Sequence, residues 1–202
     1  MTLQNVDDSK SALLFSIIRP LPVAQYVIDV PIYQLERMLT RYEQEWGLDL
    51  TPDFQRGHVW TDAQRIAYLE GMFRGSVGQS QRQIQFNAPH WHNEHHGGDL
   101  PDEMQLLDGL QRLTTIRRFM AGELRIFKGL HMQDLDGSAF SSKMSQYALS
   151  FAIHTIPWRR DLLDYYLAIN TGGTPHSKAE IKRVRGLLAS AAEPGSRRIV
   201  EF

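Results

Sequence analysis

The sequence predicts an α+β fold in a single domain. Its 202 residues are enough for one sizeable core, and its 42% hydrophobic and 22% charged residues are typical of a globular protein. Short strand-like and helix-like stretches follow one another without the regular alternation of a doubly wound α/β sheet. We expect the domain to span residues 1–192 and residues 193–202 to be disordered.

Composition and charge exclude several classes of protein. The chain has no cysteine, so neither a disulfide framework nor thiolate chemistry is available. The apolar run at residues 12–18 leads into Arg19-Pro20, and it lacks the basic start and the length of a signal peptide or a membrane span. We therefore expect a cytoplasmic protein with no membrane partner. The net charge of −1 gives no overall attraction to nucleic acid.

The first quarter of the chain reads as a loose start, a strand and a helix. The first dozen residues are polar and expected to be loose. Residues 26–30 are rich in β-branched side chains and predict a strand that ends at Pro31. The next apolar residues recur at intervals of three and four, which predicts a helix that ends at Gly47. They are Ile32, Leu35, Leu39, Tyr42 and Trp46.

The next segment predicts a loop, a helix and two strands. After a brief extended piece at residues 48–50, the loop at residues 52–60 carries Gln55-Arg56, and we expect its Trp60 to anchor the loop by packing. Thr61 or Asp62 caps a helix that ends at Gly75. Its expected buried residues are Ile66, Leu69, Met72 and Phe73. Alternation over residues 81–87 predicts a strand beside a second one at residues 104–107.

The most informative stretch is residues 106–115, where a Leu-rich run stops at Asp108-Gly109 and a helical pattern begins at once. This is a strand, a tight turn and a helix. Gly109 allows close approach of a ligand, and the first helical amides have no intrahelical partners, so an anion fits there. Gln111 and Arg112 can reach the same anion, while Asp108 can hold a metal or orient a water. Alternatively, Asp108 only caps the helix and Arg112 is a solvated charge.

The last third predicts two strands and two helices. We expect strands at residues 123–128 and 147–156, with a turn at residues 134–138 between them. Leu162, Leu163, Tyr166, Leu167 and Ile169 indicate a helix, followed by a loop that starts at Asn170. Residues 177–180 form a capping box for the final helix.

Two stretches are unusual in composition. Residues 177–198 hold six basic side chains against two acidic ones, so Lys178, Lys182, Arg183 and Arg185 can form a DNA-contacting face or a solvated helix face. The loop from His90 to His96 contains histidines at 90, 92, 95 and 96, a spacing that can bind zinc, nickel or copper. Because Gly97-Gly98 makes this loop flexible, we expect adventitious binding or solvation there.

Three ordered motifs resemble one known family. Asp108 to Thr115, read Asp-Gly-Leu-Gln-Arg-Leu-Thr-Thr, resembles the DGQQR-L-T-T signature of the domain at the amino terminus of GmrSD-type modification-dependent restriction enzymes. Residues 52–60 and 166–175 resemble the family's other two motifs, so the resemblance covers about two thirds of the chain. Leu110 stands where the family usually has its first Gln. The family is similar to the ParB/sulfiredoxin-like fold, which implies a short mixed sheet with flanking helices.

The resemblance also implies a nucleotide site in a DNA-defence setting. In the family, both Gln-Arg pairs are thought to converge on a nucleotide, and Gln55-Arg56 and Gln111-Arg112 are both present here. The resemblance therefore predicts a set of residues around an NTP and Mg²⁺. The residues expected to contact the nucleotide are Gln55, Arg56, Gly109, Gln111, Arg112, Thr115, Asn170 and Thr171, and those expected to hold the metal are Asp108 and Asp53. Asn170 and Thr171 can instead form a helix C-cap and turn.

The leading interpretation is a nucleotide-binding, NTP-hydrolysing domain. Arg112 and the amides of residues 109–111 would hold the phosphates, and Arg56 would approach from the other loop to stabilise the transferred charge. Asp108, with Asp53, would hold Mg²⁺ or position the attacking water. The alternative is a non-catalytic, phage- or defence-linked module that binds nucleotide, DNA or protein. A nuclease is the least favoured, because no His-Asn-His arrangement stands out and cleavage would have to come from a protein partner. The sequence leaves the base of the nucleotide and the occurrence of hydrolysis open.

Overall fold

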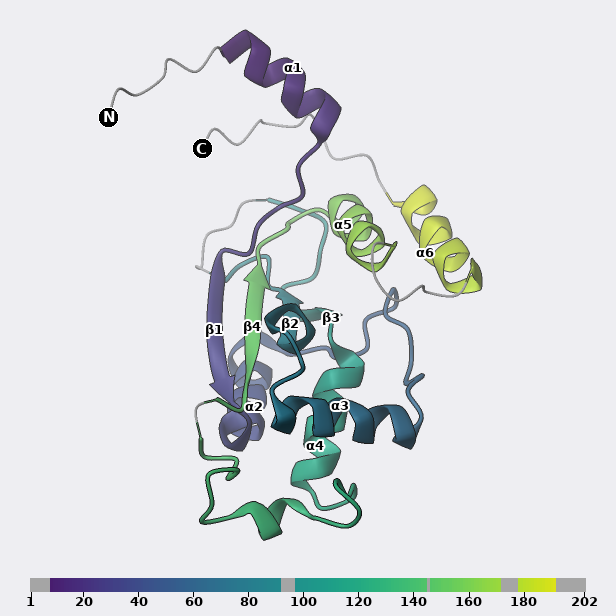
Figure 1. Ribbon diagram of the computed structural model, residues 1–202. Helices are drawn as coiled ribbons and strands as arrows, with labels where there is room; N and C mark the ends of the chain where they lie inside the picture. Colours follow the sequence, from purple (N-terminus) through teal and green to yellow (C-terminus); the bar gives the residue numbers. More distant parts are fainter. Residues whose placement is uncertain (1–7, 92–96, 145, 172–177, 192–202) are drawn as a thin grey trace, which may run out of the picture.

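The computed structural model in Figure 1 describes residues 8–91, 97–144, 146–171 and 178–191, and its class is α+β in one domain, as predicted. The described helices are α1 (Asp8–Ile18), α2 (Leu35–Trp46), α3 (Asp62–Arg74), α4 (Leu110–Met120), α5 (Arg159–Thr171) and α6 (Lys178–Ser190). The strands are β1 (Tyr26–Pro31), β2 (Gln83–Asn87), β3 (Gln105–Asp108) and β4 (Ala148–His154). Short 3₁₀ turns lie at Ile32–Gln34, Gln79–Arg82 and Met132–Leu135.

The four strands form one mixed sheet in the order β1-β4-β2-β3. β4 runs antiparallel to β1 and parallel to β2, whereas β3 runs antiparallel to β2. The expected pairing of β2 with β3 is therefore confirmed, and it places Gln85 opposite Asp108. The signature turn thus emerges from the edge strand β3.

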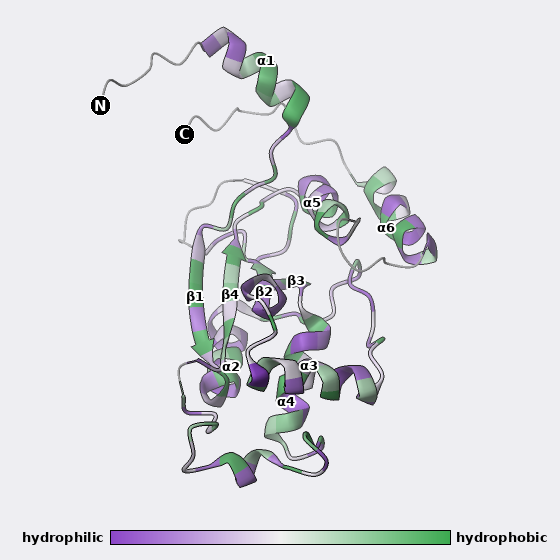
Figure 2. Ribbon diagram, in the orientation of Figure 1, coloured by the Kyte–Doolittle hydropathy of each residue, from purple (hydrophilic) through white to green (hydrophobic). Residues whose placement is uncertain are grey.

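Each face of the sheet carries its own hydrophobic cluster. Leu106 belongs to the larger cluster, which packs against α2, α3 and α4, whereas its neighbour Leu107 belongs to the smaller cluster under α5 and α6. This division follows from the two-residue period of a strand, which points successive side chains to opposite faces. Figure 2 shows the mixture of apolar and polar residues along these elements. The sheet therefore fixes α4 on one side and α5 on the other side of the β3 end.

The helix boundaries largely follow the predicted caps. α2 ends at Gly47, which adopts the left-handed conformation (φ 61°). Thr61 is the N-cap of α3 and forms a capping box with Gln64. On α3 the buried face includes Arg65 in place of Ile66, which is only half-buried. The aliphatic part of Arg65 is buried, and its guanidinium pairs with Asp62. The apolar pattern therefore predicted the wrong residue at this one position of the buried face.

Two predictions about local structure are wrong. The first dozen residues are not all loose, because α1 begins at Asp8. The segment at residues 123–128 is not a strand: it forms only an isolated bridge between Ile126 and Leu130, and Phe127 and Lys128 have positive φ. The chain turns back there, while Leu124 and Ile126 are buried, which accounts for its strand-like alternation.

Smaller differences concern where elements begin and end. β2 starts at Gln83, since residues 81–82 belong to a 3₁₀ turn, and α5 runs through Asn170 and Thr171, which we expected after the helix. Ser177 of the predicted capping box and residues 193–202 lie outside the described residues. Within the described ranges, no helix combines the length and apolar character needed to cross a membrane.

Candidate functional site

A cavity of about 170 Å³ lies where the loop at residues 52–60, the first turn of α4 and the end of α5 meet. Trp60 and the apolar Leu110 and Ile169 line it together with most of the predicted site residues. The predicted site residues in the lining are Gln55, Arg56, Asp108, Gly109, Gln111, Arg112 and Asn170. Asp53 and Thr115 do not line it, and the side chain of Thr171 lies outside the described residues. Two segments about fifty positions apart in the sequence thus converge, as the motifs implied.

The signature turn depends on Gly109. Gly109 is the N-cap of α4 with φ 106°, and a Cβ atom there would lie 2.5 Å from Ile84 Cδ1. Both the backbone conformation and the space therefore require glycine. No side chain caps α4, so Asp108 is not its cap, contrary to the alternative interpretation. The first helical turn contributes Leu110, Gln111 and Arg112 to the cavity lining, and its amides have no intrahelical acceptors.

Arg112 is held in an ion pair. Its Nη2 donates to Asp108 Oδ2 at 2.5 Å and to the Gln83 carbonyl at 2.9 Å, and only 19% of its side chain is exposed. Arg112 is therefore not a solvated surface charge. Its Nε is buried without a hydrogen-bond partner, so one donor of the guanidinium remains unused beside the cavity.

The side chain of Gln111 fastens the loop at residues 52–60 to α4. Its Oε1 accepts hydrogen bonds from the backbone N–H groups of Val59 and Trp60, each at 3.1 Å. Its Nε2 donates to the Gly57 carbonyl at 3.0 Å. The side-chain amide of Gln111 is thus used in hydrogen bonds to the backbone of the other motif. Gln111 therefore has a positioning role at the cavity wall.

Gln55 makes the reciprocal connection. Its Nε2 donates to the carbonyls of Leu106 and Leu107, each at 3.3 Å. Its Oε1 accepts from the Arg56 backbone at 3.1 Å and from the Tyr166 hydroxyl at 3.3 Å. Each motif's glutamine therefore binds the backbone of the other motif or its strand. Together they hold the loop against the end of β3.

Arg56 differs from Arg112. It is half-buried at the cavity, and its guanidinium makes no hydrogen bond or ion pair with the described part of the chain. Beside it, the half-buried Trp60 packs its ring on Tyr68 at a centroid distance of 5.4 Å, so Trp60 both anchors the loop and forms part of the wall. Among the described residues, Arg56 is therefore the cation at the cavity that an anion can reach without displacing a partner of its guanidinium.

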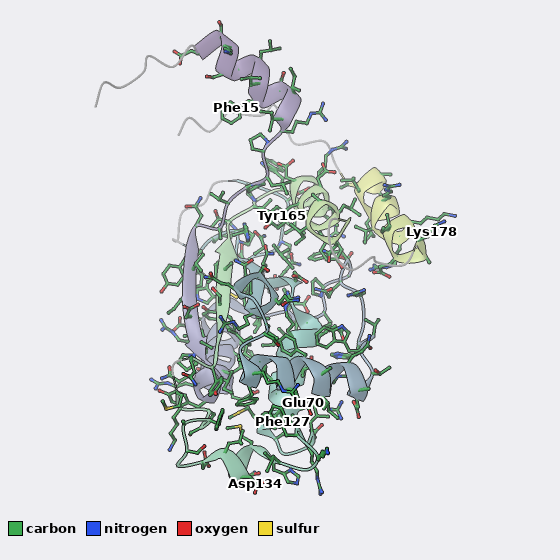
Figure 3. All side chains as sticks on the ribbon, viewed as in Figure 1. Phe15, Glu70, Phe127, Asp134, Tyr165 and Lys178 are labelled. Atoms are coloured by element: carbon green, nitrogen blue, oxygen red, sulfur yellow. The ribbon has the colours of Figure 1, made fainter. Side chains whose placement is uncertain are left out.

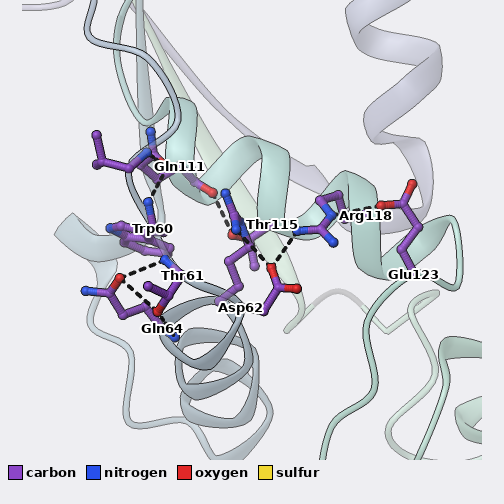
Figure 4. A network of polar contacts seen from close by, with 10 residues as sticks. Trp60, Thr61, Asp62, Gln64, Gln111, Thr115, Arg118 and Glu123 are labelled. Carbon is purple, nitrogen blue, oxygen red and sulfur yellow. Dashed lines mark hydrogen bonds and ion pairs between the residues drawn. The ribbon is translucent and has the colours of Figure 1, made fainter.

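A polar network joins the start of α3 to α4 (Figure 4). Asp62 accepts hydrogen bonds from Arg65 at 3.0 Å and Arg118 at 2.7 Å, and these two guanidinium groups, Arg118 first, lower the pKa of its carboxyl. Arg118 also pairs with Glu123 at 2.8 Å. Thr115 is fully buried and donates to the Gln111 carbonyl one turn earlier. The loop is thus held at its far end as well as by Gln111.

The remaining predicted residues divide between structural contacts and the surface. Asp53 pairs with Arg159 at 2.5 Å, so the structure does not bring its carboxylate into the cavity with Asp108. Arg183 donates to the carbonyls of Asp53, Phe54 and Gln55 and pairs with Glu180, which fastens α6 to the loop. The other three basic residues of the predicted DNA-contacting face are exposed at helical spacing on α6: Lys178, Lys182 and Arg185.

The histidine-rich loop lies mostly outside the described residues. His90 pairs with Asp102 at 2.9 Å, whereas the positions 92, 95 and 96 are not described. Among the described side chains, no group of three or more His, Cys, Asp or Glu residues is placed to hold a metal ion.

A polar cluster that no sequence pattern indicated lies beneath α5. The Tyr165 hydroxyl donates to Gln85 Oε1 at 2.6 Å and lies 3.0 Å from His154 Nε2. Burial lowers the pKa of His154 to about 4, and burial followed by the charge of Asp108 raises the pKa of Tyr165 to about 12. The cluster therefore lies within electrostatic reach of the site. A His and a Tyr within apolar strand and helix patterns carry no spacing signal that would reveal it.

The fold and the site define a domain in which two Gln-Arg motifs meet at the start of a helix. Comparison with known families gives the same class: residues 35–155 match the family described as GmrSD restriction endonuclease, N-terminal domain. Because the match covers more than half of the chain, the protein belongs to this family, which links it to restriction and phage defence. The matched range contains both Gln-Arg motifs. Neither the curated proteins nor the solved structures gave a match.

Proposed function

We propose that this chain is a nucleotide-binding, NTP-hydrolysing domain of the phage-defence type, with the phosphates held at the Asp108 to Arg112 turn. The observation that carries the proposal is the cavity itself. One wall combines the uncapped first turn of α4 with Arg112, and the opposite motif contributes Arg56, whose guanidinium makes no hydrogen bond or ion pair among the described residues. Convergent amides and guanidinium groups favour an anion with several oxygens.

The size of the cavity indicates which part of a nucleotide it holds. Its volume of about 170 Å³ is below the roughly 300–1,000 Å³ of ordinary small-molecule sites. It suits the phosphates, so the sugar and base would extend past its rim. The Asn170 Nδ2 donates to the Tyr166 carbonyl at 2.8 Å, and among the described residues its Oδ1 has no hydrogen bond, so it could make such a contact.

The Asp108–Arg112 pair suggests how charge is redistributed on binding. A phosphate would compete with Asp108 for the Arg112 guanidinium, and Mg²⁺ would compete with Arg112 for the Asp108 carboxylate. Mg²⁺ is usually held by one or two carboxylates plus phosphate oxygens and water, and Asp108 is the carboxylate that lines the cavity. Bound there, the ion would neutralise developing phosphate charge. Asp53 would join only after leaving Arg159.

The second candidate is a non-catalytic module that binds DNA or a protein partner. It is favoured by the exposed face of Lys178, Lys182 and Arg185 on α6 (Figure 3 labels Lys178). Such a face contacts phosphates without reading bases. Here any DNA cleavage would belong to a protein partner. Nucleotide binding without turnover would fit this candidate.

The decisive experiment is a thermal shift titration of ATP, GTP, CTP and UTP with Mg²⁺, followed by phosphate release for any nucleotide that binds. Ligand binding to the folded state raises the unfolding midpoint with concentration. We expect Arg56→Ala to abolish the shift and Arg125→Ala, which removes an exposed arginine outside the cavity, to retain it. No shift with any nucleotide at millimolar concentration would contradict the proposal. Binding without phosphate release would select the second candidate.

A further inference from the structure

The exposed apolar residues of this protein are concentrated in its N-terminal arm, which we define as residues 8–27. The arm consists of α1, the linker that follows it and the start of β1. Of the fourteen large hydrophobic side chains exposed in the described residues, nine lie in the arm. They are Leu13, Leu14, Phe15, Ile17, Ile18, Leu21, Val23, Tyr26 and Val27. Such a concentration marks an interaction surface, whereas scattered exposed residues do not.

Helix α1 needs a partner to be stable. It has 11 residues and no buried residue, and it stands apart from the body in Figures 1 and 3, where Phe15 is labelled on it. Isolated helices shorter than about 12–15 residues are marginal in water. Its apolar residues follow one another from Ala12 to Ile18, interrupted only by Ser16, and do not segregate to one face. The body described here leaves α1 uncovered.

We propose that the arm is a dimerisation surface, and that its occupant is the arm of a second copy of this chain lying antiparallel about a two-fold axis. The charges at the ends of the helix favour this arrangement. Asp8 lies at the start of α1 and Arg19 directly after its end. In an antiparallel pair, Asp8 of each copy lies beside the partner's Arg19, and the helix dipoles oppose each other favourably.

The arm also continues onto an open sheet edge. β1 is the outer strand of the sheet, and Tyr26 and Val27 on it are 41% and 54% exposed. These two residues therefore extend the exposed apolar surface of the arm onto the edge of the sheet. At about 100 Å² for each of the five exposed side chains on α1, each copy would bury on the order of 500 Å² in the helix pair, the size of a weak dimer interface, below the roughly 800 Å² per partner of a standard one.

A lipid surface fits the arm less well. Interfacial helices carry a polar face rich in Lys and Arg opposite their apolar face. In the arm, Lys10 and Arg19 are the basic residues, Asp8 offsets one of them, and the apolar residues surround the helix. A two-fold pair uses the same patch twice and needs no such face.

Sedimentation velocity of the full chain over a range of concentrations tests the proposal. We expect a dimer whose dissociation constant rises at least about tenfold in the double variant Phe15→Glu, Ile18→Glu. The control Phe140→Glu changes a residue that is 52% exposed outside the arm, and it should remain dimeric. Because α1 buries no residue, the double variant should keep the cooperative thermal unfolding of the body. A monomeric wild-type chain at about 100 μM overturns the proposal, and so does a dimer unaffected by the double variant.

Single cysteines test the antiparallel arrangement, since the chain has none of its own. Leu13 is the midpoint of α1, so Leu13→Cys should form a disulfide-linked dimer on mild oxidation. Asp8→Cys should not, because antiparallel copies separate this position from itself by about 15 Å, beyond the reach of a disulfide. A mixture of Asp8→Cys and Ile18→Cys should form the mixed dimer. Efficient linkage of Asp8→Cys to itself overturns the arrangement.

Discussion

The two Gln-Arg motifs have the same dipeptide, but their glutamines and arginines differ in the contacts that they make. Both glutamines bind the backbone of the opposite motif or its strand, so they build the junction. The arginines differ: Arg112 is paired with Asp108, whereas the guanidinium of Arg56 makes no hydrogen bond or ion pair with the described part of the chain. In such a motif, the glutamine can therefore stabilise the fold while the arginine that follows it is available to bind a ligand.

The largest expected effect is on Gln111. Replacing it with Ala leaves the N–H groups of Val59 and Trp60 and the Gly57 carbonyl without their partner. We expect the free energy of unfolding to fall by roughly 3 kcal/mol, measured by urea denaturation, because each unsatisfied polar group costs about 1 kcal/mol or more. Gln133→Ala, at an exposed glutamine, is the control and should change little. An equal loss in both variants would remove the distinction between the motif glutamine and an ordinary one.

The pH dependence of stability separates the junction from the polar cluster behind it, because glutamine does not titrate. Burial lowers the pKa of His154 from 6.5 to about 4. Between these values the unfolded chain binds a proton that the folded chain does not, so this stability is complete above pH 6.5 and is lost as the pH falls toward 4. The loss is roughly 2 to 3 kcal/mol. The measurement is the difference in the free energy of unfolding between pH 7 and pH 4.5, from urea denaturation. His154→Gln should remove this loss of stability, whereas Gln111→Ala should retain it.

Gln55 should matter less than Gln111 for stability. Its hydrogen bonds to Leu106 and Leu107 are 3.3 Å long, against 3.0 and 3.1 Å for those of Gln111. We expect Gln55→Ala to cost about 1 to 2 kcal/mol. Since both glutamines join the same two segments, the double variant should lose less than the sum of the two single losses. Strict additivity in urea denaturation would mean that the two connections act independently.

The sequence predicted the position of this junction better than its inner contacts. Local residue patterns predicted the helix caps at Gly47 and Thr61, the pairing of β2 with β3 and the turn at Gly109. The roles of Gln55 and Gln111 depend on backbone groups about fifty residues away, which no local pattern reveals. The resemblance to the restriction endonuclease family brought the two motifs together, but it could not show which side chains are already used.

Arg56 should contribute less to stability than either glutamine. Arg56→Ala removes no hydrogen bond or ion pair within the described residues, so the free energy of unfolding should change by no more than about 0.5 kcal/mol. Inorganic triphosphate binding, followed by isothermal titration calorimetry, should nevertheless be lost, because Arg56 offers at the cavity a guanidinium with no partner among the described residues. Arg56→Lys keeps the charge without the planar fork and should recover part of the affinity. A destabilised Arg56→Ala that still binds triphosphate would reverse the roles assigned to the two residues of the motif.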